Sequence, residues 1–277
     1  NSNTRPGGAE RAYYGKLEFP YLPADGLFQT AAELRLVKGV SRELFFGEDA
    51  DLDGILDPAE DRDGNGRLDR GLAGLTTVYG YERNRAGGGM RRLNVAEADE
   101  AMLRQRLNFS AALARGVVEA RGRGAWTSLF DLLDVQPSTN VQPDGSDERE
   151  AVKTVDMDWL AKHLDSLTLS REDRLPAKVN INTAPRDVLL TLPEMTGDLA
   201  DRVIQHRASD AGPFDTVGEL RTANVVDEKR FRAMAEKVTV RSNVFQIGST
   251  RGVRKRIVAV VDRGATPMRV LYWNEET

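Results

Sequence analysis

Residues 179–207 read VNINTAPRDVLLTLPEMTGDLADRVIQHR, and this stretch decides the fold because the chain carries a second version of it. Residues 93–121 read LNVAEADEAMLRQRLNFSAALARGVVEAR, and an offset of 86 residues places Asn94 on Asn180 and Arg121 on Arg207. An internal repeat defines the architecture before any single residue does. Each copy predicts a short helix, a tight connection and a second helix, which is the pattern of a helix-hairpin-helix unit.

A capped helix start follows each copy and occurs a third time earlier in the chain. The three starts carry the hydroxyl residues Thr30, Ser128 and Thr216. An acid follows each hydroxyl by three residues, which is the spacing of a capping box, and an aromatic residue precedes it by two. We interpret these positions as structural. Each unit is predicted to close with a short strand, at residues 77–79, 168–170 and 239–241, and the stretches 81–91 and 138–150 are predicted to be exposed loops.

Composition excludes several classes of protein. The chain has 277 residues, a net charge of −4 and no cysteine, so a disulfide framework and a thiolate metal site are excluded, and no electrostatic attraction to a polyanion is indicated. It has only two histidines, His163 and His206. No His, Cys or Ser set has the spacing of a metal or nucleophile site, so the sequence does not indicate an enzyme.

An acidic insertion spans residues 48–71, and its first part has the spacing of a twelve-residue calcium loop. Gly54 stands at position 6, where the loop turns sharply, and Ile55 at position 7 would contribute its backbone carbonyl. The predicted carboxylate ligands stand at positions 1, 3, 5, 9 and 12: Asp49, Asp51, Asp53, Asp57 and Glu60. The first loop is therefore predicted to bind one Ca²⁺ ion, with a structural role.

A second loop follows at once. Its predicted ligands are Asp61, Asp63, Asn65, the carbonyl of Arg67, and Asp69. Position 12 is Leu72, so the closing glutamate is missing, and this loop is predicted to bind a second Ca²⁺ more weakly or to borrow a ligand such as Glu48. The alternative is a solvated acidic loop, although clustered carboxylates repel one another unless a cation neutralises them.

The pattern changes after Lys237. Three runs, 238–247, 253–262 and 268–273, are rich in β-branched and apolar residues and are separated by glycine and proline. Regular spacing of this kind predicts an antiparallel meander. The fold class is therefore α+β: residues 1–236 form a helical repeat domain, with repeats near 93–135 and 179–236, and residues 237–277 form a small antiparallel sheet.

Some helix-hairpin-helix proteins bind DNA, using a Gly-apolar-Gly hairpin whose N–H groups meet a phosphate. Here the connection in the second copy keeps only Gly197 and places Glu194 near the expected contact, and the first copy has no glycine there. An acid opposes phosphate binding. The basic cluster Arg251, Arg254, Lys255 and Arg256 lies in the sheet segment and is interpreted as a solvated face or partner contact.

Taken together, NINTAPRDVLLTLPEMTGDLADRVIQHR, GPFDTVGEL and EKVTVRSNVFQI resemble general secretion pathway protein K, the large minor pseudopilin of type II secretion systems. The segment GGAERAYYGKLEFPYLPADGLFQTAAELRLVKGVSRELFFG is similar to the helical domain of that family. The resemblance implies a periplasmic protein held in the inner membrane by an N-terminal helix that is absent from this sequence. It also implies a pilin-like C-terminal sheet, a place at the tip of the pseudopilus and other minor pseudopilins as partners, with no nucleic acid.

Two alternatives remain open at this point. The first is a helix-hairpin-helix DNA-binding protein of a DNA-uptake or type IV pilus system. The second is a calcium-dependent adhesin or scaffold module, which an exposed apolar patch away from the sheet would favour. The calcium ligands rest on the spacing of the loops alone and not on the family resemblance.

Overall fold

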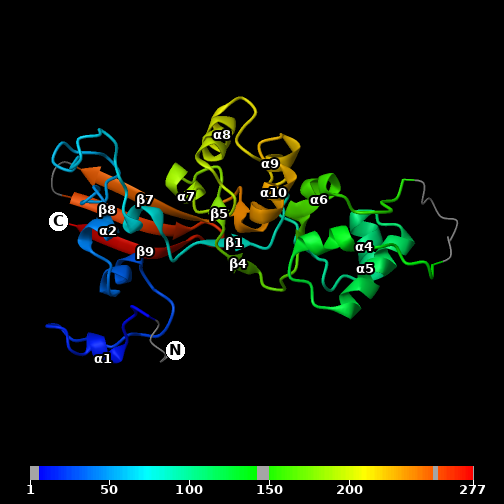
Figure 1. Cartoon of the computed structure of the whole chain (residues 1–277), viewed down its shortest axis with the longest axis horizontal. Helices are drawn as coiled ribbons and strands as arrows, with labels where there is room; N and C mark the ends of the chain where they lie inside the picture. The colour runs from blue at the N-terminus through cyan, green and yellow to red at the C-terminus, as the bar shows by residue number, and fades with distance from the viewer. Residues whose placement is uncertain (1–5, 142–149, 252–254, 277) are drawn as a thin grey trace. The chain divides into compact units, whose positions relative to one another are not determined.

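The computed structural model describes residues 6–141, 150–251 and 255–276, and the chain forms two compact units (Figure 1). Unit 1 takes residues up to Tyr79 together with 247–259 and 272–277, and unit 2 takes 80–246 and 260–271. The three C-terminal strands contribute residues to both units. The predicted division at residue 236 remains a prediction.

The described part of unit 1 contains four short helices. They are α1 (Arg11–Tyr14), the 3₁₀ helix η1 (Ala31–Leu36), α2 (Arg42–Phe46) and α3 (Leu72–Leu75). Thr30 and Glu33 form the predicted capping box at the start of η1, and the Thr30 N–H donates to Glu33 Oε1 at 2.9 Å. None of the helices in the described ranges is both long enough and apolar enough to cross a membrane.

Unit 2 contains the two repeats, preceded by strand β1 (Tyr81–Arg83). Repeat one, residues 93–170, contains β2 (Leu93–Asn94), α4 (Glu100–Leu107), α5 (Ala111–Arg123), η2 (Leu129–Asp134), α6 (Met157–His163), η3 (Leu164–Ser166) and β3 (Leu167–Thr168). Strand β4 (Arg174–Pro176) connects it to repeat two. Repeat two, residues 179–241, contains β5 (Val179–Asn180), α7 (Arg186–Leu189), α8 (Gly197–Ala208), α9 (Glu219–Thr222), α10 (Glu228–Met234), η4 (Ala235–Lys237) and β6 (Val238–Thr239).

The two repeats are built alike, as the sequence predicts. In each, the opening strand pairs in parallel with the closing strand, β2 with β3 and β5 with β6. An arginine on the second helix of each repeat bonds to the backbone at the start of that repeat. Arg121 donates to the carbonyls of Val95 and Ala98, at 3.1 and 2.7 Å. Arg207 donates in the same way to the carbonyls of Ile181 and Ala184, both at 2.8 Å. The repeated arginine is therefore a structural element of the unit.

Replacing Arg207 by methionine should lower the free energy of unfolding by about 1 to 3 kcal/mol, because two part-buried carbonyl groups lose a charged donor. Thermal or urea unfolding measures the change. Arg202, exposed on the same helix, provides the matched control as Arg202→Met. Equal stability of the two variants would contradict the structural role of Arg207.

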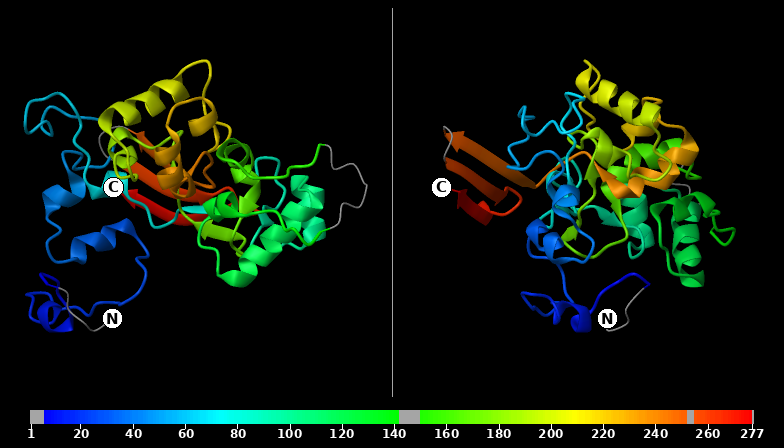
Figure 2. Two further views of the ribbon diagram at one scale, coloured as in Figure 1. Left: turned by 45° about the vertical axis from the view of Figure 1, so that its right-hand side comes forward. Right: turned by 60° about the vertical axis from the view of Figure 1, so that its left-hand side comes forward.

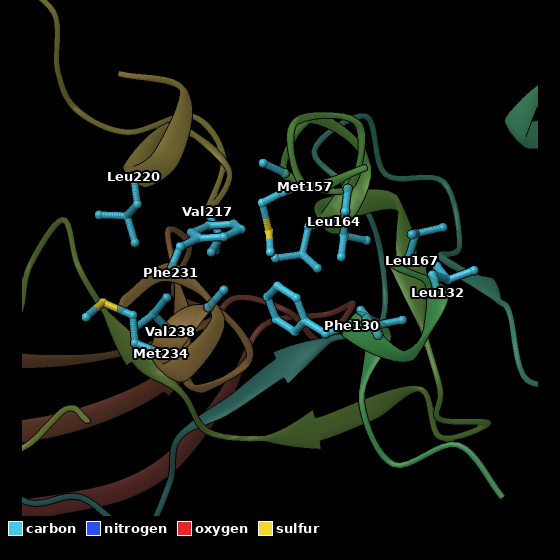
Figure 3. Close-up of a cluster of buried hydrophobic side chains, with 14 of the residues drawn as sticks. Phe130, Leu132, Met157, Leu164, Leu167, Val217, Leu220, Phe231, Met234 and Val238 are labelled. Carbon is cyan, nitrogen blue, oxygen red and sulfur yellow. The ribbon is translucent and has the colours of Figure 1, made fainter. Parts of the chain in front are cut away.

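One hydrophobic core runs through both repeats. Phe130 of η2 and Phe231 of α10 are nearly fully buried, and their rings meet edge to face with centroids 6.0 Å apart (Figure 3). Met157 and Val217 lie between these elements in the same cluster. Gly218 lets α9 approach α6, since an added Cβ would lie 1.9 Å from the carbonyl oxygen of Ala161. Because they share this core, the repeats form one folded body.

The C-terminal strands are β7 (Val244–Arg251), β8 (Lys255–Asp262) and β9 (Arg269–Glu276), and they form one sheet in the order β7-β8-β9. Figure 2 shows them side by side in both views. Neighbouring strands joined by such short connections run antiparallel, so this is the predicted meander. The first predicted run is interrupted, because residues 238–239 form β6 within repeat two and β7 begins only at Val244.

Three local expectations were wrong. No strand forms at 77–79, and the strand near that position is β1. The stretch 81–91 is no open loop: β1 pairs antiparallel with β4, and Arg85 and Arg91 form an antiparallel bridge. The third helix start, α9, begins at Glu219 with Gly218 as its N-cap, although Glu219 still accepts from the Thr216 N–H at 3.1 Å. Most of the stretch 138–150 lies outside the described residues.

Candidate metal centre

The acidic insertion is closed at its base by pairing between its two ends. Gly47 and Arg70 form an antiparallel bridge, and the Glu48 N–H donates to the Asp69 carbonyl at 2.8 Å. Gly47 has a φ of 65°, and an added Cβ would lie 2.1 Å from the Asp69 oxygen. An added Cβ at Gly71 would lie 2.3 Å from the nitrogen of Gly47. This neck, formed by residues 47–48 and 69–71, holds the start and end of both loops together.

The first loop gathers three carboxylates. Asp49, Asp51 and Asp53 each offer an oxygen, and these oxygens lie within 4.8 Å of one another. The loop is shaped by its own backbone: the Asp53 N–H donates to Asp51 Oδ1 at 3.1 Å, and the Ile55 N–H donates to Asp53 Oδ1 at 2.7 Å. Asp49 is only 4% exposed, and its buried Oδ1 has no hydrogen-bond partner. A buried, unpaired carboxylate oxygen beside two other carboxylates is a position that a cation would stabilise.

The second loop repeats this geometry twelve positions later. The Asn65 N–H donates to Asp63 Oδ1 at 3.0 Å, and the Arg67 N–H donates to Asn65 Oδ1 at 2.6 Å. Asp61 accepts from the Gly66 N–H at 3.1 Å. Its equivalent, Asp49, accepts a hydrogen bond from the N–H of Gly54. The two loops are therefore copies in their internal hydrogen bonds as well as in their sequence.

Glycine is required at the sharp turn of both loops. Gly54 and Gly66 have φ values of 78° and 69°, in the left-handed region that a side chain disfavours. Leu52 and Gly64, two residues earlier in each loop, also have positive φ values, 60° and 70°. The two loops therefore share their backbone conformation at these positions.

The variant Gly54→Ala should lose about 1 to 2 kcal/mol of stability through backbone strain alone, because no atom lies within 4 Å of the added Cβ. Thermal unfolding measures the loss. Gly88→Ala is the matched control, because Gly88 also has open space around its Cβ position and is not among the glycines with positive φ. A similar Tm for the two variants would contradict the requirement for glycine at position 54.

Burial raises the pKa of Asp49, and the negative charges of Asp51, Glu60 and Asp53 raise it further, against the hydrogen bond from Gly54 that lowers it. Because the pKa of Asp49 lies above its ordinary value, the folded loop disfavours the ionised form of this carboxyl group. A cation in the loop would offset this repulsion, since it would interact with all of these oxygens.

The structure does not bring all of the predicted ligands into the first carboxylate cluster. Glu60 is outside the first cluster, and its carboxylate accepts from the Ala50 N–H at 2.8 Å and the Asp57 N–H at 3.3 Å, which closes the loop. Metal ligation by each of the predicted residues stays a prediction. Sequence reasoning missed the neck, although two glycines flanking an acidic insertion are a signal for it.

The short hairpins of the repeats are a second candidate site. Asn108, between α4 and α5, and Glu194, between α7 and α8, take positive φ values of 55° and 59°. Glu194 Oε2 is 3.1 Å from Lys229 Nζ. An acid therefore stands in the hairpin of repeat two, where a phosphate-binding version would present N–H groups.

Comparison with known families gives two matches. Residues 1–46 match the family model described as type II secretion system (T2SS), protein K. Residues 176–239 match the helix-hairpin-helix motif, which agrees with the fold of repeat two. No curated protein matches the chain.

These findings define the class of protein as a component of a type II secretion system, which works in the bacterial cell envelope. Within that system, residues 1–46 match protein K, and the resemblance drawn from the sequence is confirmed. The match covers unit 1 residues that precede the acidic insertion.

Proposed function

We propose that this chain is a minor pseudopilin at the tip of a type II secretion pseudopilus and that it works by binding other minor pseudopilins. The match of residues 1–46 to protein K carries the proposal. In this role it is an assembly component without catalysis. Supporting this, His163 stacks on Trp159 and His206 on Phe214, so both imidazoles serve packing.

The proposed location is the periplasm, with a membrane helix preceding the residues of this sequence as anchor. The sheet β7-β8-β9 would be the pilin-like part that joins neighbouring pilins. Support comes from β9, where Leu271 and Trp273, two residues apart and so on one face of the strand, are 40% and 58% exposed. Large apolar side chains left in water are typical of contact surfaces, and tryptophan is enriched among residues that dominate binding energy.

Calcium would stabilise the acidic insertion in this role. The observations that support it are the three clustered carboxylates of the first loop and the unpartnered Oδ1 of buried Asp49. Calcium prefers oxygen ligands in loops of this spacing. The ion would fix a loop that otherwise carries many like charges, so its role would be structural.

Mixing the chain with the periplasmic domains of the other minor pseudopilins of the same secretion system tests the assembly role. Size-exclusion chromatography should show a hetero-complex, and Trp273→Ser should weaken it by about 2 kcal/mol, roughly thirtyfold, if the side chain is an anchor. Met102→Ser replaces an exposed apolar side chain of α4 and is the control. A chain that elutes alone at every mixing ratio would contradict the proposal.

The helix-hairpin-helix match keeps DNA binding as a second candidate. Glu194 in the hairpin and the net charge of −4 oppose it. Filter binding with duplex DNA across a salt series decides between the two. Binding that weakens steeply with salt would favour the DNA-binding candidate, because phosphate contacts release counterions, whereas the pseudopilin proposal expects no retained DNA.

A further inference from the structure

The two repeats differ at a position that forms side-chain hydrogen bonds in one of them only. In repeat two, Asn182 joins two separate parts of the chain, because its Nδ2 donates to the carbonyls of Phe214 and Val240, at 2.8 and 3.1 Å. Its Oδ1 accepts from the Phe214 N–H at 3.0 Å. This one carboxamide therefore holds the residue that follows β6 beside the aromatic residue that precedes α9.

Repeat one has the same backbone here but no carboxamide. Ala96 stands at the position of Asn182, by the offset of 86 residues. The Ala96 N–H donates to Asn94 Oδ1 at 3.0 Å, as the Asn182 N–H does to Asn180 Oδ1 at 2.9 Å. The difference between the repeats lies in the side chain and not in the local fold.

The groups that correspond to the partners of Asn182 are left without a bond in repeat one. Trp126 corresponds to Phe214, as the aromatic residue two positions before the capping hydroxyl, and Leu169 corresponds to Val240, as the first residue after the closing strand. Across the described part of the chain, no protein group bonds to the backbone N–H or carbonyl of Trp126 or to the carbonyl of Leu169. One donor and two acceptors are therefore free at positions that bond to a carboxamide in repeat two.

A cavity of about 580 Å³ lies at this junction in unit 2. Its wall includes Leu169 and Thr127, the residue after Trp126. Thr127 and Pro176 in the same wall are exposed, so the cavity is open to solvent. A concave, mostly apolar space with a few polar groups is typical of a binding site. Buried apolar side chains of both repeats line it, and Figure 3 labels four of them: Leu164, Leu167, Val217 and Val238.

The charges of the wall are already compensated, which favours a neutral ligand. Glu82 pairs with Arg92 at 2.6 Å and with Lys178 at 3.4 Å. Asp165 pairs with Arg92 at 3.1 Å, and Glu236 accepts from a backbone N–H at 2.8 Å. An ionic ligand would bring an unpaired charge into a mostly apolar cavity, at a large cost in desolvation, whereas a neutral amide would not.

The strand pair beside the cavity has a further unsatisfied amide. Asn94 pairs with Thr168, which lines the cavity, and the Nδ2 of Asn94 is buried without a hydrogen-bond partner. In repeat two the equivalent Asn180 donates from Nδ2 to Ser242 Oγ at 2.8 Å. Repeat one carries Arg171 at the position of Ser242, so this bond is also missing there. Since buried polar groups are nearly always satisfied in native proteins, repeat one is incomplete where repeat two is closed.

We propose that the cavity is a docking site for an extended segment of a partner protein, and that an asparagine side chain of this segment bonds as Asn182 does in repeat two. A carboxamide offers two N–H donors and one carbonyl acceptor, which complements the two carbonyls and the N–H left free at Trp126 and Leu169. Aliphatic residues on either side of the asparagine would pack on the apolar wall. The site goes beyond the assembly role proposed above and depends neither on that role nor on calcium.

Titration of the ¹⁵N-labelled whole chain with the capped peptide acetyl-Leu-Asn-Leu-amide, followed by NMR, tests the site. The backbone amide signals of Trp126 and Leu169 should shift and reach saturation. The matched peptide acetyl-Leu-Asp-Leu-amide should bind at least about tenfold more weakly, because a carboxylate has no donor for the two carbonyls and carries a charge. Equal affinity of the two peptides, or no shift of these signals at millimolar peptide, would overturn the proposal.

The variant Ala96→Asn places the missing carboxamide in the chain itself. It should raise the melting temperature, because it supplies the bonds that Asn182 makes in repeat two, and it should weaken binding of the asparagine peptide by at least about tenfold, because it occupies the same place. Ala101→Asn, at an exposed position of α4, is the control and should bind the peptide as the wild type does.

Unchanged peptide binding in Ala96→Asn would mean that the peptide lies elsewhere and would overturn the site. A melting temperature that does not rise would contradict the equivalence of the two repeats at this position, on which the proposal depends. If Ala96→Asn does not fold by circular dichroism, the comparison of the two peptides on the wild type decides.

Discussion

Excess calcium is expected to raise the melting temperature of the chain, and a chelator to reverse the rise. An ion that binds only the folded insertion stabilises it by about 2.7 kcal/mol when its concentration is a hundred times Kd. For a domain of this size class, that corresponds to roughly 5–10 °C. Binding of two ions would raise the melting temperature further. Differential scanning calorimetry in calcium and then in chelator measures the shift.

The double variant Asp51→Ala and Glu60→Ala should lose the calcium-dependent rise, because it removes a clustered carboxylate and the residue that closes the first loop. Glu18→Ala with Asp210→Ala removes the same number of exposed acids elsewhere and should keep the rise. If chelator leaves the wild-type Tm unchanged, the insertion is a solvated acidic loop and the calcium proposal is wrong. The secretion assignment would then rest on the protein K match alone.

The sequence predicted best those elements that depend on residues close together in the chain. The repeat was visible because the same side chains recur at the same offset, and Arg121 and Arg207 do make equivalent bonds. The loop bonds at Asp51, Asp53 and Asp63 follow from the spacing of the acids. Short-range hydrogen bonds of this kind need no information about distant segments.

The features that the sequence did not predict depend on partners far along the chain. The stretch 81–91 is polar and rich in glycine, which indicates a loop, but Glu82 at 5% exposure pairs with the buried Arg92 and contacts Thr239, 157 residues away. No local pattern encodes such a contact. The neck of the insertion was not predicted for the same reason, because only the folded chain brings residues 48 and 69 together. The sequence offers Glu48 as a possible ligand of the second loop but does not show where its side chain lies.

An ionic cluster in unit 2 consists of the buried residues Arg92 and Glu82 and the part-buried residues Asp165 and Arg241. Arg92 bonds to Glu82 Oε1 at 2.6 Å and to Asp165 Oδ1 at 3.1 Å, and Arg241 bonds to Asp165 Oδ2 at 2.5 Å. Burial raises the pKa of Glu82, but the hydrogen bond from Arg92 and the charges of Lys178 and Arg92 lower it by more, so the net pKa lies below its usual value. The pKa of Asp165 is lowered against its burial by Arg241, Gly87 and Arg92.

Arg92→Met should therefore cost about 3–5 kcal/mol at neutral pH, because it leaves the buried carboxylate of Glu82 and the part-buried carboxylate of Asp165 each short of one partner. Urea unfolding measures this loss. Arg83→Met, at an exposed position of β1, is the matched control and should change stability by no more than about 0.5 kcal/mol. An equal stability of the two variants would contradict the structural importance of the cluster.

The pH dependence separates a lost ion pair from lost packing. In the wild type the two carboxylates have lowered folded pKa values, so their contribution is fully present above the unfolded pKa values of about 4 and is lost as the pH falls through the folded values. In Arg92→Met, Glu82 keeps Lys178 and Asp165 keeps Arg241 as a partner, so the folded pKa values of both carboxyl groups should be lowered less than in the wild type. Acidification from neutral pH should therefore cost the variant less stability than the wild type, and the difference in unfolding free energy between them should become smaller. Adding Glu82→Leu to Arg92→Met should recover part of the stability at neutral pH, because the double variant leaves one fewer buried charge. A deficit that stays constant with pH and is not relieved by the second substitution would mean that Arg92 acts through packing alone.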